Sequence, residues 1–187
     1  MGNSTLKPFV RKNLDILFIG LNPATISSQK GHYFSVKQSL WTQLYKSGLI
    51  LEEVNKDFAD ERIFGDTIFN VNHCSFGITD LVTHIADSNS NQIKPTANDC
   101  KQLEKTILEY NPRVAIILHS KVLSIFISKY LGEKKYSSNS GYMGKLLAQR
   151  NCDTVFFNIA FPHGNSIPDE EKIRKYREVK DFILNLE

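Results

Sequence analysis

The segment from Leu14 to Phe34, LDILFIGLNPATISSQKGHYF, places polar and aromatic side chains directly after an apolar run. The run predicts a buried strand that ends at Gly20, and Asn22 follows at its carboxyl end. Ligands of open α/β sheets bind in the crevice at this end, and the neutral amide of Asn22 can both donate and accept hydrogen bonds. Gly, Asn and Pro also form ordinary strand-to-loop turns, so the pattern alone leaves both interpretations open.

Strand and helix patterns alternate along the rest of the chain. Apolar runs predict strands over residues 14–20, 67–75, 113–120 and 154–161. Apolar stripes at helical spacing predict helices over residues 40–48, 100–110, 122–131 and 173–186. The alternation favours an α/β fold in three layers, α/β/α, with a central four-stranded, mainly parallel sheet. The segment 129–145 is basic and rich in Ser and Gly, and we predict a mobile loop there.

Length and composition narrow the class of protein. With 187 residues, 41% of them hydrophobic, the chain is long enough for one full core, so we expect a single domain over residues 1–187. The longest apolar runs have the length of strands, and the start of the sequence lacks the apolar core of a secretory signal. These features predict a cytoplasmic protein without a membrane span.

The three cysteines, Cys74, Cys100 and Cys152, lie far apart and form no C-x-x-C pair. Neither a disulfide framework nor a zinc or iron–sulfur site is supported by this spacing, so we predict buried thiols. The sequence thus predicts no metal and no cofactor, and we expect a monomer.

The formal net charge of +3 is small but unevenly distributed. Basic side chains predominate from His119 to Arg150, and acidic ones predominate from Leu51 to Arg62. Such asymmetry suits a protein with one face toward nucleic acid, although charge runs are also common on ordinary solvated surface. Within the basic segment, Lys134 and Lys135 are predicted contacts to DNA phosphates.

Several motifs occur in one order: GLNPA, KGHYF, LWTQLYKSGL and GITDLV, followed by FPHGNS. They resemble the mismatch-specific uracil-DNA glycosylase and thymine-DNA glycosylase group of the uracil-DNA glycosylase superfamily, whose first motif reads G-I-N-P-G. The likeness covers roughly residues 15–182. It implies the fold of that superfamily and a monofunctional DNA glycosylase, which flips a nucleotide out of double-stranded DNA and hydrolyses its N-glycosidic bond without a cofactor.

The resemblance assigns roles to the first motif and to the loop that follows it. Asn22 would orient the attacking water, but an amide is no base, so catalysis would depend on stabilising charge in the transition state. Gly20 and Leu21 would border the flipped base, Phe34 would stack on it, and Tyr33 would line the pocket. A place in the hydrophobic core is the alternative for Phe34.

The second motif departs from its relatives because a histidine, His163, stands inside it. This side chain would donate to the leaving base or to a phosphate, or else merely pack at the end of a strand. By position, Asn165, Ser166 and Ile167 would form the loop that wedges into the duplex and grips phosphate. Lys30 in the loop after the first motif is a further predicted contact to DNA.

Asp80 in GITDLV stands where the thymine-glycosylase pattern has an Asn that reads the edge of the base. A carboxylate only accepts hydrogen bonds, which suits the exocyclic amine of cytosine, whereas uracil and thymine present a carbonyl there. The resemblance therefore implies that Asp80 reads the base and favours 5-substituted cytosines. A surface or capping aspartate is the alternative.

Three functions are compatible with these patterns. The first is a DNA glycosylase for damaged, mismatched or modified pyrimidines, which would act in mismatch repair or, with bulky 5-substituted cytosines as substrates, in defence against viral DNA. The second is a module that binds modified or abasic DNA without efficient catalysis. The third is a nucleotide-binding α/β protein unrelated to DNA, although the sequence has neither a G-x-G-x-x-G nor a Walker pattern.

Overall fold

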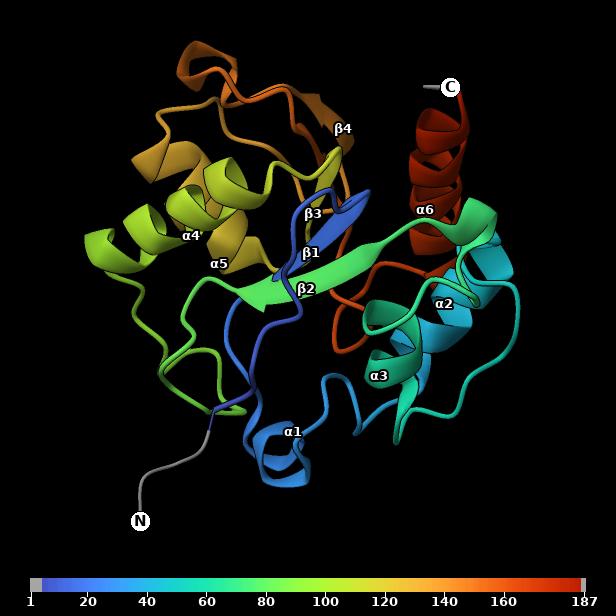
Figure 1. The fold of residues 1–187 in the computed structure, drawn as a ribbon. Coiled ribbons are helices and arrows are strands. Elements are labelled where there is room, and N and C mark those ends of the chain that lie inside the picture. Colours follow the sequence, from blue (N-terminus) through green and yellow to red (C-terminus); the bar gives the residue numbers. More distant parts are fainter. Residues whose placement is uncertain (1–4, 186–187) are drawn as a thin grey trace.

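The computed structural model describes residues 5–185, and its centre is a five-stranded mixed sheet between two helical layers (Figure 1). The strands follow the spatial order β2-β1-β3-β5-β4. Their bounds are β1 Ile16–Gly20, β2 Phe76–Asp80, β3 Val114–Ile117, β4 Gly141–Gly144 and β5 Val155–Asn158. The α-helices are α1 Thr25–Lys30, α2 Ser39–Ser47, α3 Ala59–Phe64, α4 Ala97–Tyr110, α5 Ser120–Val122 and α6 Asp169–Leu184. Shorter or irregular helices are η1 Val71–His73, the π-helix η2 Leu123–Tyr130 and η3 Ala148–Arg150.

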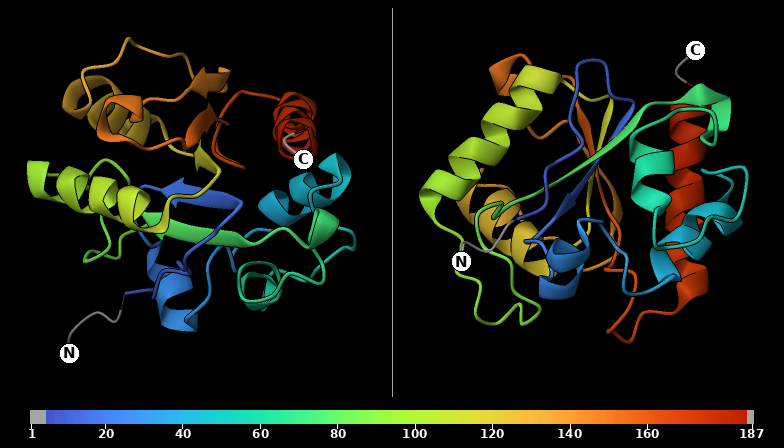
Figure 2. Two further views of the ribbon diagram at one scale, coloured as in Figure 1. Left: turned by 45° about the horizontal axis from the view of Figure 1, so that its top comes forward. Right: turned by 60° about the horizontal axis from the view of Figure 1, so that its bottom comes forward.

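Both faces of the sheet are covered, which explains why the central strands are apolar throughout (Figure 2). In β1, Ile16 and Phe18 face the layer of α2, α3 and α6, whereas Leu17 and Ile19 face the layer of α4 and η2. This alternation follows from the two-residue period of a strand. The three-layer α/β prediction is therefore confirmed, and the parallel strands place their carboxyl ends at one edge of the sheet.

The second predicted strand, over residues 67–75, is wrong. Asn72 and His73 have left-handed backbone angles, with φ of 46° and 53°, which a strand does not permit, and the segment forms the 3₁₀ turn η1. The strand is the next segment, β2, which pairs in parallel with β1. The alternating pattern of 67–75 resembled a half-buried strand, whereas the true strand is buried on both faces.

The predicted count of four strands is also wrong, because the predicted mobile loop 129–145 contains β4. This strand pairs antiparallel with β5 at the edge of the sheet and carries a bulge between Tyr142 and Gly144. Gly141 and Gly144 have positive φ angles of 78° and 88°. Glycines weaken the pattern by which a strand is recognised in a sequence, which accounts for the error.

The four predicted helices are present with shifted bounds; the last predicted residue of the final helix, Leu186, lies outside the described residues. All three cysteines are buried, as predicted. Within residues 5–185, no helix combines the length and the apolar character needed to cross a membrane.

Candidate active site

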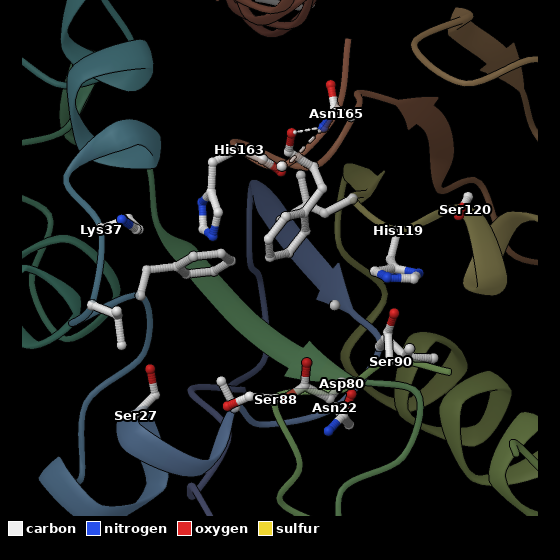
Figure 3. Close-up of a pocket in the computed structure, with 18 of the residues that line it drawn as sticks. Asn22, Ser27, Lys37, Asp80, Ser88, Ser90, His119, Ser120, His163 and Asn165 are labelled. Atoms are coloured by element: carbon white, nitrogen blue, oxygen red, sulfur yellow. Dashed lines mark hydrogen bonds between the residues drawn. The ribbon is translucent and has the colours of Figure 1, made fainter. Parts of the chain in front are cut away.

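The carboxyl edge of the sheet opens into a cavity of about 800 Å³ (Figure 3). It lies beyond the ends of β1, β2, β3 and β5, which is where open α/β sheets bind ligands. The cavity brings together predicted site residues from both motifs and from the loops between them: Gly20, Leu21, Asn22, Tyr33, Phe34, Asp80, His163, Asn165, Ser166 and Ile167. Segments far apart in the sequence therefore converge on one space.

Asn22 is held by backbone carbonyl groups. Its Nδ2 donates to the carbonyl oxygens of Asp87 at 2.8 Å and Pro23 at 3.0 Å, with a longer contact of 3.5 Å to Ile85. Because these bonds occupy the donor half of the amide, Oδ1 is the atom left for a ligand. The sequence allowed Asn22 both to donate and to accept hydrogen bonds with a ligand. In the structure it can only accept one, for example from water, because both amide hydrogens are already bound.

The aromatic loop is fixed by a buried carboxylate. Asp60 at the start of α3 accepts from the Tyr33 backbone N–H at 2.7 Å and lies 3.0 Å from Nδ1 of His32. The indole Nε1–H of Trp41 donates to the Phe34 carbonyl oxygen at 3.3 Å. These contacts hold Phe34 at a left-handed φ of 51°, a conformation that costs about 1–3 kcal/mol in a residue with a large side chain.

The ring of Phe34 lines the cavity while one part of it contacts the core. Its centroid lies 6.2 Å from that of Trp41, edge to face, and 5.9 Å from that of Phe161. The ring is only partly buried, so the core alternative and the pocket role are not exclusive here. A base stacked on the cavity side of this ring would leave both contacts in place.

Asp80 and Tyr33 form a buried polar floor. The sheet register pairs Asp80 with Gly20, and a Cβ atom at Gly20 would collide with Oδ1 of Asp80, so glycine leaves room for the carboxyl group. Asp80 is only 5% exposed, which excludes the surface alternative. Burial raises its pKa to about 7, and interaction with the Tyr33 hydroxyl partly offsets that rise.

Two atoms of this floor lack hydrogen-bond partners among the described residues. They are Oη of Tyr33 and Oδ2 of Asp80, whose mutual geometry falls outside that of a good hydrogen bond. Burial and the nearby charge of Asp80 raise the pKa of Tyr33 as well, so its hydroxyl keeps its proton. Buried polar atoms without partners require an explanation, and the polar edge of a ligand in the cavity supplies one.

We expect Asp80→Asn to stabilise the fold increasingly as the pH rises. Because the pKa of Asp80 is raised from 3.8 to about 7, the native state holds this proton more tightly than the unfolded chain does. The native protein therefore loses stability from about pH 4 to about pH 7, and the neutral amide avoids that loss, which reaches about 4 kcal/mol at about 1.4 kcal/mol per pKa unit. Urea unfolding of both proteins at pH 4, 6 and 8 measures the difference.

The matched control is Asp181→Asn, which changes the same chemical group on the exposed side of α6. A difference in unfolding free energy between native protein and Asp80→Asn that stays constant from pH 4 to pH 8 would contradict the assignment of a buried, hard-to-ionise carboxyl group.

The loop of the second motif places His163 at the cavity. Its ring packs edge-on against Phe161 at 5.0 Å, and its Nδ1 is buried without a partner among the described residues. Burial and the positive charge of Lys37 lower the pKa of His163, which keeps the ring neutral at pH 7. The Asn165 side chain donates to the carbonyl of Phe161 at 2.7 Å and accepts from the Ile167 backbone N–H at 3.1 Å, so it shapes the loop itself.

A buried lysine anchors this loop from behind. Nζ of Lys172 donates to the Pro162 carbonyl at 3.2 Å, and Nε2 of Gln43 donates to the same oxygen at 2.9 Å. Both side chains also contact the Asp169 carboxylate, at 3.5 Å and 3.0 Å. The first residue of α6 and the start of the loop are thus held together by one polar cluster beneath the cavity.

Three predicted DNA contacts are not part of the cavity lining. Lys30 donates to the Ser35 carbonyl and pairs with Asp57 at 3.3 Å. Lys134 and Lys135 follow η2 and do not line the cavity, whereas Ser138 of the same loop does. Contact between these two lysines and DNA stays a prediction.

Sequence reasoning overlooked other cavity residues, notably Lys37, His119 and Phe161. His119 follows β3 just as Asn22 follows β1, so the rule that singled out Asn22 would also have found it. Lys37 is exposed and has no ion-pair partner within residues 5–185. It carries a free positive charge at the cavity.

These features define an α/β protein with a cavity at the carboxyl ends of its parallel strands. The cavity contains a hydrogen-bond acceptor, Asn22 Oδ1, the aromatic ring of Phe34, and the buried polar floor of Asp80 and Tyr33. The sequence matches the uracil DNA glycosylase superfamily over residues 7–167, and the chain belongs to that superfamily. The matched range contains all of the motifs that indicated the resemblance. Membership implies a DNA-binding glycosylase that acts on pyrimidine bases.

Proposed function

We propose that this protein is a monofunctional DNA glycosylase of the mismatch-specific uracil/thymine type. It flips one pyrimidine nucleotide out of duplex DNA into the cavity and hydrolyses the N-glycosidic bond, leaving an abasic site. The observation that carries this proposal is the arrangement around the cavity: Asn22 keeps only Oδ1 for a ligand, and Phe34 is held toward the cavity in a strained conformation.

The proposed reaction uses these groups in sequence. The flipped base stacks on Phe34, a contact worth about 1–3 kcal/mol. Asn22 Oδ1 accepts a hydrogen bond from a water molecule and thereby orients the oxygen of that water toward the sugar carbon C1′. The bond from C1′ to the base breaks with its electron pair on the base, the water oxygen bonds to C1′, and the excess proton passes to solvent. Because an amide is a poor base, departure of the base limits the rate.

We further propose a preference for cytosine-type bases that carry a bulky group at C5. An ionised Asp80 accepts from the exocyclic amine of cytosine but faces the carbonyl of uracil or thymine unfavourably. The cavity volume of about 800 Å³ lies within the range of about 300–1,000 Å³ that holds drug-sized ligands, and it supports a base with a C5 substituent. Excision of such bases from viral DNA would serve as defence.

A base screen tests the proposal directly. Duplexes with uracil, thymine, cytosine, 5-methylcytosine or 5-hydroxymethylcytosine opposite guanine are incubated with the protein, and abasic sites are revealed as alkali-labile breaks. We expect breaks, most rapidly with the 5-substituted cytosines at pH 8. Tight binding to modified or abasic duplexes without breaks would favour the alternative of a non-catalytic DNA reader. If the protein produces no breaks and binds none of the duplexes, both functions are overturned.

We expect Lys37→Ala to weaken binding to all duplexes alike and to lower the salt dependence of affinity by about one unit of slope, as loss of one phosphate contact does. We expect this effect because Lys37 carries a positive charge at the cavity that no ion pair compensates within residues 5–185. Binding titrations at several salt concentrations measure the slope.

The double variant Lys134→Ala/Lys135→Ala serves as comparison. If the basic loop contacts DNA, the slope of the salt dependence should fall by about one to two units in this variant. We expect a smaller fall because neither lysine lines the cavity, although Ser138 of the same loop does.

A further inference from the structure

The described segment 81–96 joins β2 to α4 and forms neither helix nor strand. It supplies two of the carbonyl groups to which Asn22 Nδ2 donates, those of Asp87 at 2.8 Å and Ile85 at 3.5 Å. The backbone N–H of Asp87 donates in return to the Pro23 carbonyl at 3.0 Å. The orientation of the Asn22 amide therefore depends on the position of this segment.

Packing in the core fixes only the two ends of the segment. Leu81 and Val82 are buried at its start and Ile93 is buried toward its end, with at most 2% of each exposed. Residues 83–92 between them are exposed or half-buried. Hydrophobic contacts thus do little to hold the middle of the segment, and its hydrogen bonds must do so.

Lys121 ties this segment to the centre of the sheet. Its Nζ donates to the Ser90 carbonyl and, at 2.9 Å, to the Ile93 carbonyl. Lys121 belongs to α5, which begins just after β3, so its backbone is fixed by the central strands. Within residues 5–185, the partners of its ammonium group are these carbonyls and no carboxylate. A charged donor makes stronger hydrogen bonds than a neutral one, which suits Lys121 to hold an otherwise loosely packed segment.

The segment held by Lys121 reaches the cavity beside Asn22. Asp87, Ser88 and Ser90 all line the cavity, and in the view of Figure 3 Asn22 lies between Ser88 and Ser90. A shift of the segment moves the Asp87 carbonyl and turns the amide of Asn22 with it. Misplacing a catalytic group by about 1 Å can cost about 100-fold in rate.

We propose that Lys121 is a positioning residue for Asn22. It fixes the segment 81–96 through the carbonyls of Ser90 and Ile93, and the segment in turn fixes the Asn22 amide. This role rests on the proposed function, in which Oδ1 of Asn22 orients the attacking water. Lys121 does not itself line the cavity. A lysine that contacted a DNA phosphate instead would change affinity rather than the rate of excision, so the two roles can be told apart.

The test compares Lys121→Met, which keeps an apolar stem without a donor, with Lys121→Arg, which keeps charged donors. Single-turnover excision and affinity are measured on the best duplex of the base screen. We expect Lys121→Met to lose about 10- to 100-fold in rate with little change in affinity, and Lys121→Arg to retain most of the rate. The matched control is Lys105→Met, on the exposed side of α4, which should keep both values.

A double-mutant cycle distinguishes positioning from a general loss of structure. If Lys121 acts through Asn22, the variant Asn22→Ala/Lys121→Met is no slower than Asn22→Ala alone, because no amide is left to position. Rate losses that multiply would overturn the inference. A Lys121→Met variant that loses affinity while keeping its rate would overturn it as well. Lys121→Gln, whose uncharged amide is too short to reach both carbonyls, replaces Lys121→Met should that variant not fold.

Exchange of the Asn22 side-chain amide hydrogens with water tests the same role without catalysis. Nuclear magnetic resonance of the isotope-labelled protein measures it, and the signals are identified by their loss in Asn22→Ala. We expect exchange about tenfold faster or more in Lys121→Met, and unchanged in Lys105→Met. If the native protein excises no base of the screen, the proposed function fails, yet faster exchange still supports the positioning of Asn22 by Lys121. Unchanged exchange in Lys121→Met overturns that positioning.

Discussion

We expect the replacement of Asn22 by alanine to lower the single-turnover rate of base excision by about two to four orders of magnitude, the scale expected for a positioned polar catalyst. The substitution removes Oδ1, the acceptor that would orient the attacking water. We expect DNA binding to stay nearly intact, because the Phe34 ring and the charge of Lys37 remain. Single-turnover kinetics on the best duplex of the base screen, together with a binding titration, separate these effects.

The amide of Asn22 also ties its own turn to the loop at Asp87, so alanine costs some stability, about 1 kcal/mol for a lost hydrogen bond of this kind. The matched control is Ser88→Ala, which removes the bond from the Thr25 backbone N–H to the Ser88 hydroxyl between the same two loops. We expect the control to retain its rate within several-fold. Near-normal turnover of Asn22→Ala would remove the basis for assigning chemistry to the first motif.

If Asp80 reads the base as proposed, we expect Asp80→Asn to exchange the preferred base. An ionised Asp80 against the carbonyl of uracil would remain unpaired in a buried place, which would suppress that substrate by orders of magnitude, whereas it would gain a charge-assisted hydrogen bond from cytosine. Asparagine offers a donor instead. We expect the rate ratio of 5-methylcytosine to uracil to fall by about 100-fold or more in Asp80→Asn at pH 8.

Because the pKa of Asp80 is about 7, we expect the proposed base preference to depend on pH in the native protein. Below pH 7 the protonated carboxyl group can donate to uracil, and above pH 7 the carboxylate accepts from cytosine, so the ratio should rise between pH 6 and pH 8. In Asp80→Asn the ratio should be flat. Tyr33→Phe removes the hydroxyl that lowers the pKa of Asp80, and it should move the rise to higher pH. Rapid uracil excision at neutral pH, unchanged by the asparagine, would mean that Asp80 does not read the base.

The central fold could be predicted because its signals are local. Strands β1, β3 and β5 are continuous apolar runs, and α4 and α6 show helical stripes within a few residues of their true bounds. Strand β4 could not be predicted, because two of its four residues are glycines and because its pairing with β5 is a tertiary contact that a local sequence pattern does not reveal. The misplaced second strand has a similar cause, because η1 depends on left-handed residues that the pattern does not reveal.

The candidate site was predictable where a motif names the residue. The cavity brings Asn22, Phe34, Asp80 and His163 together, as the resemblance required. The supports were not predictable: Asp60 lies in an acidic run that resembles solvated surface, yet it is fully buried beneath the aromatic loop. Lys172 likewise reads as an ordinary helical lysine, and only the packing of α6 buries it.

The left-handed backbone at Phe34 makes this position hard to replace. Glycine or asparagine would adopt that conformation at lower backbone cost, but either would give up the ring contacts with Trp41 and Phe161. Another aromatic residue would keep a ring but would carry the same backbone cost. The position therefore combines a strained backbone with a ring that faces the cavity, and no single substitution relieves the first without losing the second.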